Sequence, residues 1–169
     1  VQGAGSVGAK LVRLLAEAGA IVLVGDLDQE RARAAGGGLV EPDAVIGADC
    51  DVYAPCALGA TLSEASIPRL RCRIVAGGAN NQLATPEDAA RVRAAGILYA
   101  PDFVINAGGA MHGIGLEQLG WDEDELERRV RGIGDTLTRI FEAADAEGIP
   151  TDAAAERLAA EALSRPAAA

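Results

Sequence analysis

The sequence predicts an α/β domain built on a doubly wound parallel sheet, with extra helices at its C-terminal end. The 21 glycines are too many for a helical bundle, show no collagen-like period, and fall after strand-like and before helix-like segments. Only 3% of the residues are aromatic although 50% are hydrophobic, so the core must consist of Ala, Val, Leu and Ile. A chain of 169 residues can bury such a core in one domain.

The first half of the chain alternates helix and strand signals. After a glycine-rich turn, apolar residues recur at helical spacing and end at Gly19. A continuous apolar run follows, which is typical of a strand buried on both faces of a parallel sheet. Pro55 stops the next strand. The predicted elements are a helix over 7–18, a strand over 21–24, a helix over 29–35 and a strand over 51–54.

The second half adds strands over 74–76 and 97–99, with a helix between them. Thr85 and Pro86 predict its start, as a hydroxyl N-cap and a proline at the first helical position, and Gly96 predicts its end. A long helix follows. Thr151 predicts the start of a last helix, as its N-cap, and this helix reaches about residue 163. The apolar stripe of the long helix comprises Leu126, Val130, Ile133, Leu137, Ile140 and Ala144.

Charge and cysteine content exclude several classes of protein. The net charge is −10 and no Lys/Arg cluster is present, which argues against a nucleic-acid binder. The three cysteines form no CxxC pair, so we expect neither a metal site nor a disulfide framework, and reduced thiols fit a cytoplasmic protein. No apolar stretch approaches the 18 residues of a membrane span, so we expect no membrane partner.

The residues GAGSVG, from Gly3 to Gly8, match the GxGxxG fingerprint of Rossmann-type dinucleotide-binding domains. Gly3 makes the tight turn, Gly5 lets the backbone approach the pyrophosphate, and Gly8 allows close helix–strand packing. Asp26, 18 residues beyond Gly8, ends the second predicted strand and can accept hydrogen bonds from ribose hydroxyls. A carboxylate there repels a 2′-phosphate, so the predicted cofactor is NAD. The alternative interpretation of the fingerprint is a glycine turn that binds nothing, and that of Asp26 is a solvated strand end.

Three further loops follow predicted strands, at residues 54–59, 77–82 and 101–109. Ligands of doubly wound sheets bind at the carboxyl ends of the strands, so these loops are candidates for the site. The asparagines of residues 77–82 are either turn formers or amides that face a ligand, and the residues alone leave both interpretations open.

The stretches APCALG, GGANNQL and YAPDFVINAGG, in this order after GAGSVG, resemble the glutamate/leucine/phenylalanine/valine dehydrogenase family. The likeness extends over essentially the whole chain to IPTDAAAERLA. Within the family it is most similar to phenylalanine dehydrogenases, on NAGGAMHGIG and IGDTLTRIF. The resemblance implies NAD-dependent, reversible oxidative deamination of an L-amino acid to a 2-oxo acid and ammonium.

The resemblance also implies the roles of individual residues. The turn Gly3-Ala4-Gly5-Ser6-Val7-Gly8 holds the pyrophosphate, and Asp26 and Leu27 flank the adenosine ribose. Cys56 and Ala57 line the adenine side. The nicotinamide and substrate side comprises Ala79, Asn80, Asn81 and Asn106, of which Asn81 and Asn106 also reach the substrate.

The family's catalytic lysines and acid lie in a substrate domain that precedes the cofactor domain. We therefore expect no catalytic residue in this chain, and interpret Lys10 as a solvated helix residue. The predicted organisation is an NAD-binding domain over 1–150, whose first strand is truncated, and a C-terminal helix over 151–169. The resemblance implies a homo-oligomer for the full-length enzyme.

Ala110, Gly113 and Ile114 correspond to the wall of the family's substrate pocket. Ala110 and Gly113 are small and offer no group to bind a second carboxylate, which favours an aromatic substrate, phenylalanine first, over glutamate. The alternatives are a leucine or valine dehydrogenase and a non-catalytic dinucleotide-binding module. An unrelated Rossmann oxidoreductase is a weaker alternative, because His112 and the tyrosines have no evident catalytic partner in the sequence.

Overall fold

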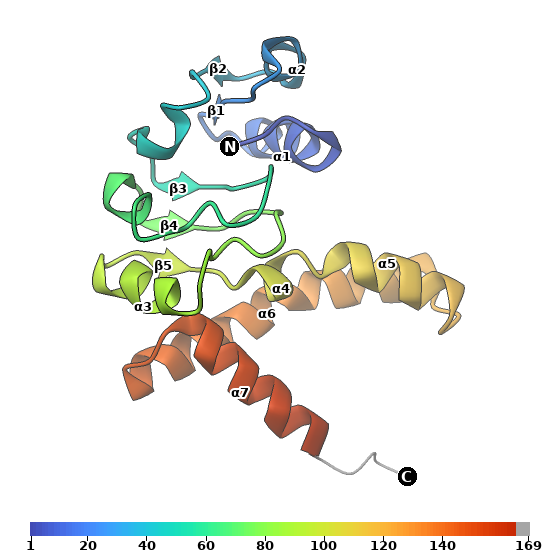
Figure 1. Ribbon diagram of the computed structural model, residues 1–169. Helices are drawn as coiled ribbons and strands as arrows, with labels where there is room; N and C mark the ends of the chain where they lie inside the picture. Colours follow the sequence, from blue (N-terminus) through green and yellow to red (C-terminus); the bar gives the residue numbers. More distant parts are fainter. Residues whose placement is uncertain (165–169) are drawn as a thin grey trace.

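In the computed structural model, which describes residues 1–164, helices and parallel strands alternate along the chain (Figure 1). The α/β prediction is confirmed. The strands are β1 (Leu23–Val24), β2 (Gly38–Leu39), β3 (Val52–Tyr53), β4 (Ile74–Val75) and β5 (Leu98–Tyr99). The helices are α1 (Ser6–Glu17), α2 (Gln29–Ala35), α3 (Glu87–Ala94), α4 (Asp102–Ile105), α5 (Gly108–Glu117), α6 (Glu123–Glu147) and α7 (Thr151–Ser164), with 3-10 turns η1 (Val45–Gly47) and η2 (Ile67–Arg69).

The strands form two parallel sheets, β1-β2 and β3-β4-β5. Gln2 joins them, because it makes parallel bridges to Gly25 after β1 and to Pro55 after β3. Its backbone N–H donates to the Ala54 carbonyl at 2.9 Å, and its carbonyl accepts the Cys56 N–H at 2.7 Å. Figure 1 shows the N-terminus at this place, between β1 and β3.

With Gln2 counted as a strand position, the spatial order is β2-β1-Gln2-β3-β4-β5. This is the 3-2-1-4-5-6 order of the doubly wound dinucleotide-binding fold. The chain leaves Gln2 towards β1 on one side and returns to β3 on the other, so Gln2 marks the topological switch point. Ligands of such sheets bind outside the carboxyl ends of the strands at that point.

Small aliphatic side chains form the core on both sides of the switch point. Val12 of α1 packs with Val24 and Ala35 on the β1 side. On the β3–β5 side, Val75 and Val92 pack with a larger group that also contains Tyr53, Leu62 and Tyr99. The two tyrosines carry polar hydroxyls into an aliphatic core, and burial raises the pKa of both phenols.

The strand predicted over residues 21–24 is shorter than expected. Ile21 is 98% exposed, so it does not belong to a strand buried on both faces. Gly19 ends α1 in the left-handed region with φ +86°, and the chain reaches the sheet only at Val22. The Val22 carbonyl accepts the Gly38 N–H at 2.8 Å and begins the pairing of β1 with β2.

Two predicted helix caps also differ in detail. At α3, the Asp88 carboxylate accepts the Thr85 N–H at 2.9 Å, so the acid caps the turn and the hydroxyl only adds a bond to the same carboxylate. At α7, Thr151 is the first helical residue, and its hydroxyl donates to the Tyr99 carbonyl at 2.7 Å. This hydrogen bond attaches α7 to the outer strand of the sheet.

The long C-terminal helix predicted from the apolar stripe is confirmed as α6, which ends at Gly148 with φ +68°. Ile140 and Ala144 are buried against Ala154 and Ala155 of α7. At its other end, Trp121 lies on Gly115 of α5, where an added Cβ would stand 2.1 Å from a ring carbon. Arg129 stacks on the same ring at 4.3 Å from its centroid.

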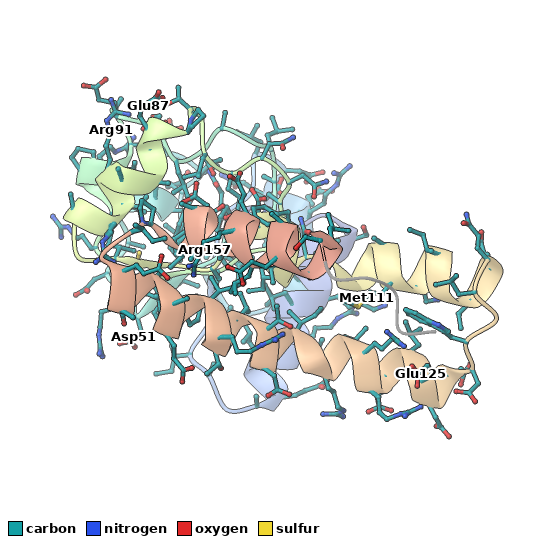
Figure 2. All side chains as sticks on the ribbon, turned by 90° about the horizontal axis from the view of Figure 1, so that it is seen from below. Asp51, Glu87, Arg91, Met111, Glu125 and Arg157 are labelled. Carbon is teal, nitrogen blue, oxygen red and sulfur yellow. The ribbon has the colours of Figure 1, made fainter. Side chains whose placement is uncertain are left out.

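Figure 2 shows Met111 between α5 and α6, where it lines an apolar groove with Trp121 and Ile133. Salt bridges lie on the outside of this helical part, such as Arg157 of α7 with Glu147 at 2.7 Å. None of the helices within residues 1–164 is long and apolar enough to cross a membrane. Residues 165–169 of the predicted C-terminal helix lie outside the described residues.

Candidate functional site

The glycine turn folds tightly against the carboxyl end of the central strand position. Gly3 has φ +95°, and a Cβ there would lie 2.8 Å from the Ala57 Cβ. A Cβ on Gly8 would lie 2.0 Å from the Gly3 carbonyl oxygen. Glycine is therefore required at both positions, the first by conformation and close approach and the second by close packing of α1 on the turn.

Gly5 differs from these two glycines because its Cβ position is open, with no heavy atom within 4 Å. It is the N-cap of α1, and no side chain of the described residues caps this helix end. The first-turn N–H groups and the positive end of the helix dipole are therefore not covered by a side chain of the described residues. A pyrophosphate fits this arrangement, because it can take those N–H groups at the place that a side chain would otherwise fill.

Asp26 is fixed beside this turn. Its carboxylate accepts the Ala4 N–H at 2.5 Å through Oδ2 and the Asp28 N–H at 2.8 Å through Oδ1. These two backbone donors, Ala4 first, lower the pKa of Asp26 below its ordinary value, so the group is ionised at neutral pH. The carboxylate links β1 to the glycine turn and keeps lone pairs free for further donors such as ribose hydroxyls.

The residues expected around the adenosine ribose and the adenine come from the two strand ends that flank the turn. Leu27 is 88% exposed directly after Asp26. Ala57 packs on Gly3 from the loop after β3, and Cys56 lies beneath it. The Cys56 Sγ accepts the Gly78 N–H at 3.4 Å and so connects the loops after β3 and β4. Burial raises the pKa of the Cys56 thiol above its ordinary value.

Because its pKa is raised, Cys56 should react slowly with iodoacetamide at pH 7 and faster only as the pH climbs past the ordinary thiol range. Its thiolate fraction is lower than that of free cysteine at every pH. Mass spectrometry of the Cys56 peptide, with free cysteine as the reference, measures this rate. Alkylation of Cys56 as fast as free cysteine at pH 7 would show an activated thiol instead.

The asparagines of the loop after β4 meet the helix after β5. The Asn106 side chain donates through Nδ2 to Asn80 Oδ1 at 2.5 Å. Asn81 adopts the left-handed region with φ +51°, and its carbonyl accepts the Ala60 N–H at 2.6 Å. Ala79 is buried between them and Pro55. The backbone of Asn81 thus forms a turn, and the side chains of Asn80 and Asn106 present their amides together at the carboxyl ends of β4 and β5.

Two buried polar residues beside these asparagines were not predicted from the sequence. Gln82 is fully buried and Asp102 is 9% exposed. Both lie in segments that the sequence predicts as loops, where polar residues suggest exposure to solvent. The one available signal was Asp102 directly after Pro101, at the first position of a short helix, and it does not indicate which group that carboxylate binds.

The three residues expected to wall the substrate pocket lie on α5, directly after the turn that carries Asn106. Ala110 is exposed, Gly113 has no heavy atom within 4 Å of its Cβ position, and Ile114 is 49% exposed. Within residues 1–164, α5 therefore presents small side chains and one large aliphatic residue to open space.

The profile of the family described as "Glutamate/Leucine/Phenylalanine/Valine dehydrogenase" matches residues 24–168. The chain belongs to this dehydrogenase family. Leucine dehydrogenase of Thermoactinomyces intermedius is 42% identical over 165 residues, which are 95% of this chain and 45% of the relative. L-tryptophan dehydrogenase of Nostoc punctiforme is 44% identical over 164 residues, 94% of this chain and 46% of the relative.

The crystal structure of L-tryptophan dehydrogenase from Nostoc punctiforme matches this dehydrogenase domain with a TM-score of 0.88 at 42% identity, covering 95% of this chain and 49% of that one. Hetero-hexameric glutamate dehydrogenase from Thermus thermophilus shares the fold, with a TM-score of 0.75 at 23% identity over 96% of this chain and 45% of that one. The chain spans about half the length of the curated relatives that it matches.

The remaining ionisable candidates of this dehydrogenase domain, Lys10 and His112, are both exposed. Lys10 is exposed on α1. His112 is exposed on α5 and lines a groove with Leu116 and Val130. Among residues 1–164, no three His, Cys, Asp or Glu side chains are arranged to hold a metal ion.

Proposed function

We propose that this chain is the NAD-binding part of an amino-acid dehydrogenase, which converts an L-amino acid reversibly to a 2-oxo acid and ammonium. One observation carries the proposal. The open N-terminus of α1 at Gly5 and the carboxylate of Asp26 lie side by side at the switch point of the sheet, joined by the Ala4 N–H. A pyrophosphate and the adjacent ribose require these two features at neighbouring positions.

The two halves of the dinucleotide then lie on opposite sides of Gln2. The adenosine half lies towards β1, where Asp26 accepts its ribose hydroxyls beside Leu27. Cys56 and Ala57, from the loop after β3, line the adenine. The nicotinamide half lies towards β4 and β5, beside Ala79, Asn80 and Asn106. NAD held by these residues would supply the hydride acceptor for oxidation at the amino acid Cα. In this proposal Asn81 and Asn106 also orient the substrate, and the turn from Gly3 to Gly8 with Ser6 and Val7 holds the pyrophosphate.

The catalytic lysines and the acid are proposed to lie in a substrate domain outside this chain. An activated lysine and a carboxylate would form and break the carbon–nitrogen bond by moving protons. Lys10 does not fit this role because it is an exposed residue of α1, whereas an activated lysine needs desolvated surroundings. The chain alone is therefore proposed to bind dinucleotide without turnover.

An aromatic amino acid, with phenylalanine first, is the proposed substrate. The open positions at Ala110 and Gly113 support it, since a large side chain needs the space that small residues leave. A leucine or valine substrate is the second candidate. It is favoured by the exposed aliphatic side chain of Ile114 and by the names of several relatives, which are leucine and valine dehydrogenases.

The cofactor proposal is tested by titrating the chain with NADH and NADPH and following the fluorescence of the reduced nicotinamide. We expect NADH to bind more tightly than NADPH, because the ionised Asp26 repels the 2′-phosphate. Asp26→Asn should bring the two affinities to within about tenfold of each other by removing that charge. Binding of neither cofactor by the folded wild-type chain contradicts the proposal. Turnover of phenylalanine by this chain alone contradicts the location of the catalytic groups.

The substrate proposal is tested on the full-length enzyme that contains this chain. The measurement compares kcat/KM for phenylalanine, tryptophan, leucine and valine at saturating NAD. We expect the aromatic amino acids to have the higher kcat/KM values. We expect Gly113→Val to lower the ratio of kcat/KM for the aromatic amino acids to kcat/KM for valine by about tenfold or more. Higher values for leucine or valine in the wild type favour the second candidate. A folded full-length protein that binds NADH but oxidises no amino acid favours a non-catalytic dinucleotide-binding module.

A further inference from the structure

The side chain of Gln82 forms hydrogen bonds within the loop that carries Asn80. Its side-chain amide is fully buried, and Nε2 donates to the carbonyl oxygens of Gly77 and Ala79, each at 2.9 Å. These two carbonyls precede Asn80 in the same loop. The amide therefore fixes the path of the backbone from the end of β4 to the asparagine.

The orientation of this amide is determined by its partners. Both are carbonyl oxygens, so only the NH2 group can face them. The opposite atom, Oε1, is buried and has no hydrogen-bond partner among the described residues. A buried acceptor without a partner is unfavourable for stability. The two hydrogen bonds donated by Nε2 are therefore the contacts that require a glutamine at this position.

Asp102 connects this loop to the helix that carries Asn106. Its Oδ2 accepts the backbone N–H of Gln82 at 2.6 Å, and its own N–H donates to the Tyr99 hydroxyl at 3.3 Å. Asp102 is the first residue of α4, and Asn106 is the C-cap of the same one-turn helix. The loop and the helix are thus joined at two points, by Gln82–Asp102 at one end and by Asn80–Asn106 at the other.

We propose that Gln82 and Asp102 are positioning residues, which hold Asn80 and Asn106 in register for the nicotinamide ring of the dinucleotide. This inference rests on the proposed function and adds two residues to it that touch neither cofactor nor substrate. Loss of either residue frees Asn80 to move relative to Asn106. It leaves the glycine turn and Asp26 unchanged, because these bind the adenosine half on the other side of Gln2.

The test compares two ligands that share the adenosine half. ADP-ribose has the adenosine, the pyrophosphate and the second ribose but no nicotinamide, whereas NADH has all four parts. Gln82→Met keeps the length of the side chain and removes both donors. We expect it to raise the Kd for NADH about tenfold while the Kd for ADP-ribose stays within about twofold of the wild type. Asp102→Ala should have the same selective effect.

Asp102→Asn is the matched control, because an amide oxygen can still accept the Gln82 N–H; we expect its affinity for both ligands to be near that of the wild type. If Gln82→Met or Asp102→Ala weakened the binding of NADH and of ADP-ribose equally, the residue would have a merely structural role and the proposal would be overturned. Unchanged NADH binding would overturn it as well. Failure of the wild type to bind either ligand would instead refute the proposed function.

If the variants do not fold, a measurement on the wild type tests the positioning role of Gln82. The side-chain NH2 signals of Gln82 in an ¹⁵N-correlated NMR spectrum report on its contacts with Gly77 and Ala79. We expect NADH to shift these signals and ADP-ribose to leave them near their free positions. Identical spectra with the two ligands bound would overturn the proposal.

Discussion

Gly5→Ser should fold like the wild type and lose NADH binding. Gly5 has φ −66° and ψ −169°, an extended conformation open to any residue, and its Cβ position has no heavy atom within 4 Å. Serine is moreover a favoured N-cap, so the free energy of unfolding should change by less than about 1 kcal/mol. The new side chain occupies the place of the pyrophosphate, and its hydroxyl competes for the same N–H groups. We expect the Kd for NADH to rise at least about tenfold.

Urea denaturation and NADH titration on the same sample separate the two effects. Gly134→Ser is the matched control, because Gly134 lies on the exposed face of α6 with no heavy atom within 4 Å of its Cβ position. It should keep both stability and binding. Gly8→Ser should lose both, since its Cβ would meet the Gly3 carbonyl at 2.0 Å. Wild-type NADH affinity in Gly5→Ser would contradict the location of the pyrophosphate at α1.

The sequence allowed prediction of the order and type of most elements, because the apolar runs and the glycines after them are local signals. Strand β2 was missed, because Gly38 and Leu39 belong to no such run. The length of the strands could not be predicted, and Ile21 illustrates the reason. Its apolar side chain belongs to the same run as Val22 and Val24, but pairing with β2 begins only at Val22. Whether a residue pairs depends on the partner strand, and this information is not local.

The outline of the candidate site could be predicted because its backbone demands specific residues. Gly3 and Gly8 are glycines for reasons of conformation and packing that a motif records directly. The role of Asp26 could be predicted from its distance along the sequence from the glycine turn, which is that of one βαβ unit. The assignment of Asn80, Asn81 and Asn106 depended on resemblance, since an asparagine in a loop serves equally well as a turn former. In the structure, the backbone of Asn81 forms a turn, and the side chains of Asn80 and Asn106 hydrogen-bond to each other.

Gln82 and Asp102 illustrate what sequence reasoning misses. A glutamine and an aspartate in glycine-rich loops suggest solvated side chains, because isolated polar residues are mostly exposed. Their burial depends on contacts between segments 20 residues apart, and each contact involves a backbone group that carries no sequence signal. Buried side chains that bind backbone atoms are therefore the class of site residue that needs a structure.

The second large effect is expected for Gly77→Ala, which should destabilise the fold where β3 and β4 end. A Cβ at Gly77 would lie 2.3 Å from the Pro55 carbonyl oxygen and 2.5 Å from the Pro55 nitrogen. These are backbone atoms of a buried residue, and the same carbonyl accepts the Ala79 N–H at 2.9 Å. The strand ends must separate to admit a methyl group, which should lower the free energy of unfolding by about 3 kcal/mol.

Gly78→Ala is the matched control, one residue further along the chain. Its Cβ would lie 2.8 Å from Val7 Cγ1, the end of a side chain that is 56% exposed and can turn to another rotamer. We therefore expect a loss of less than about 1 kcal/mol in Gly78→Ala when the two urea midpoints are compared with the wild type. The difference between two adjacent glycines isolates the contact with the Pro55 backbone from any general effect of alanine in this loop. Equal midpoints for the two variants would mean that β3 and β4 do not approach as closely at the switch point as this contact requires.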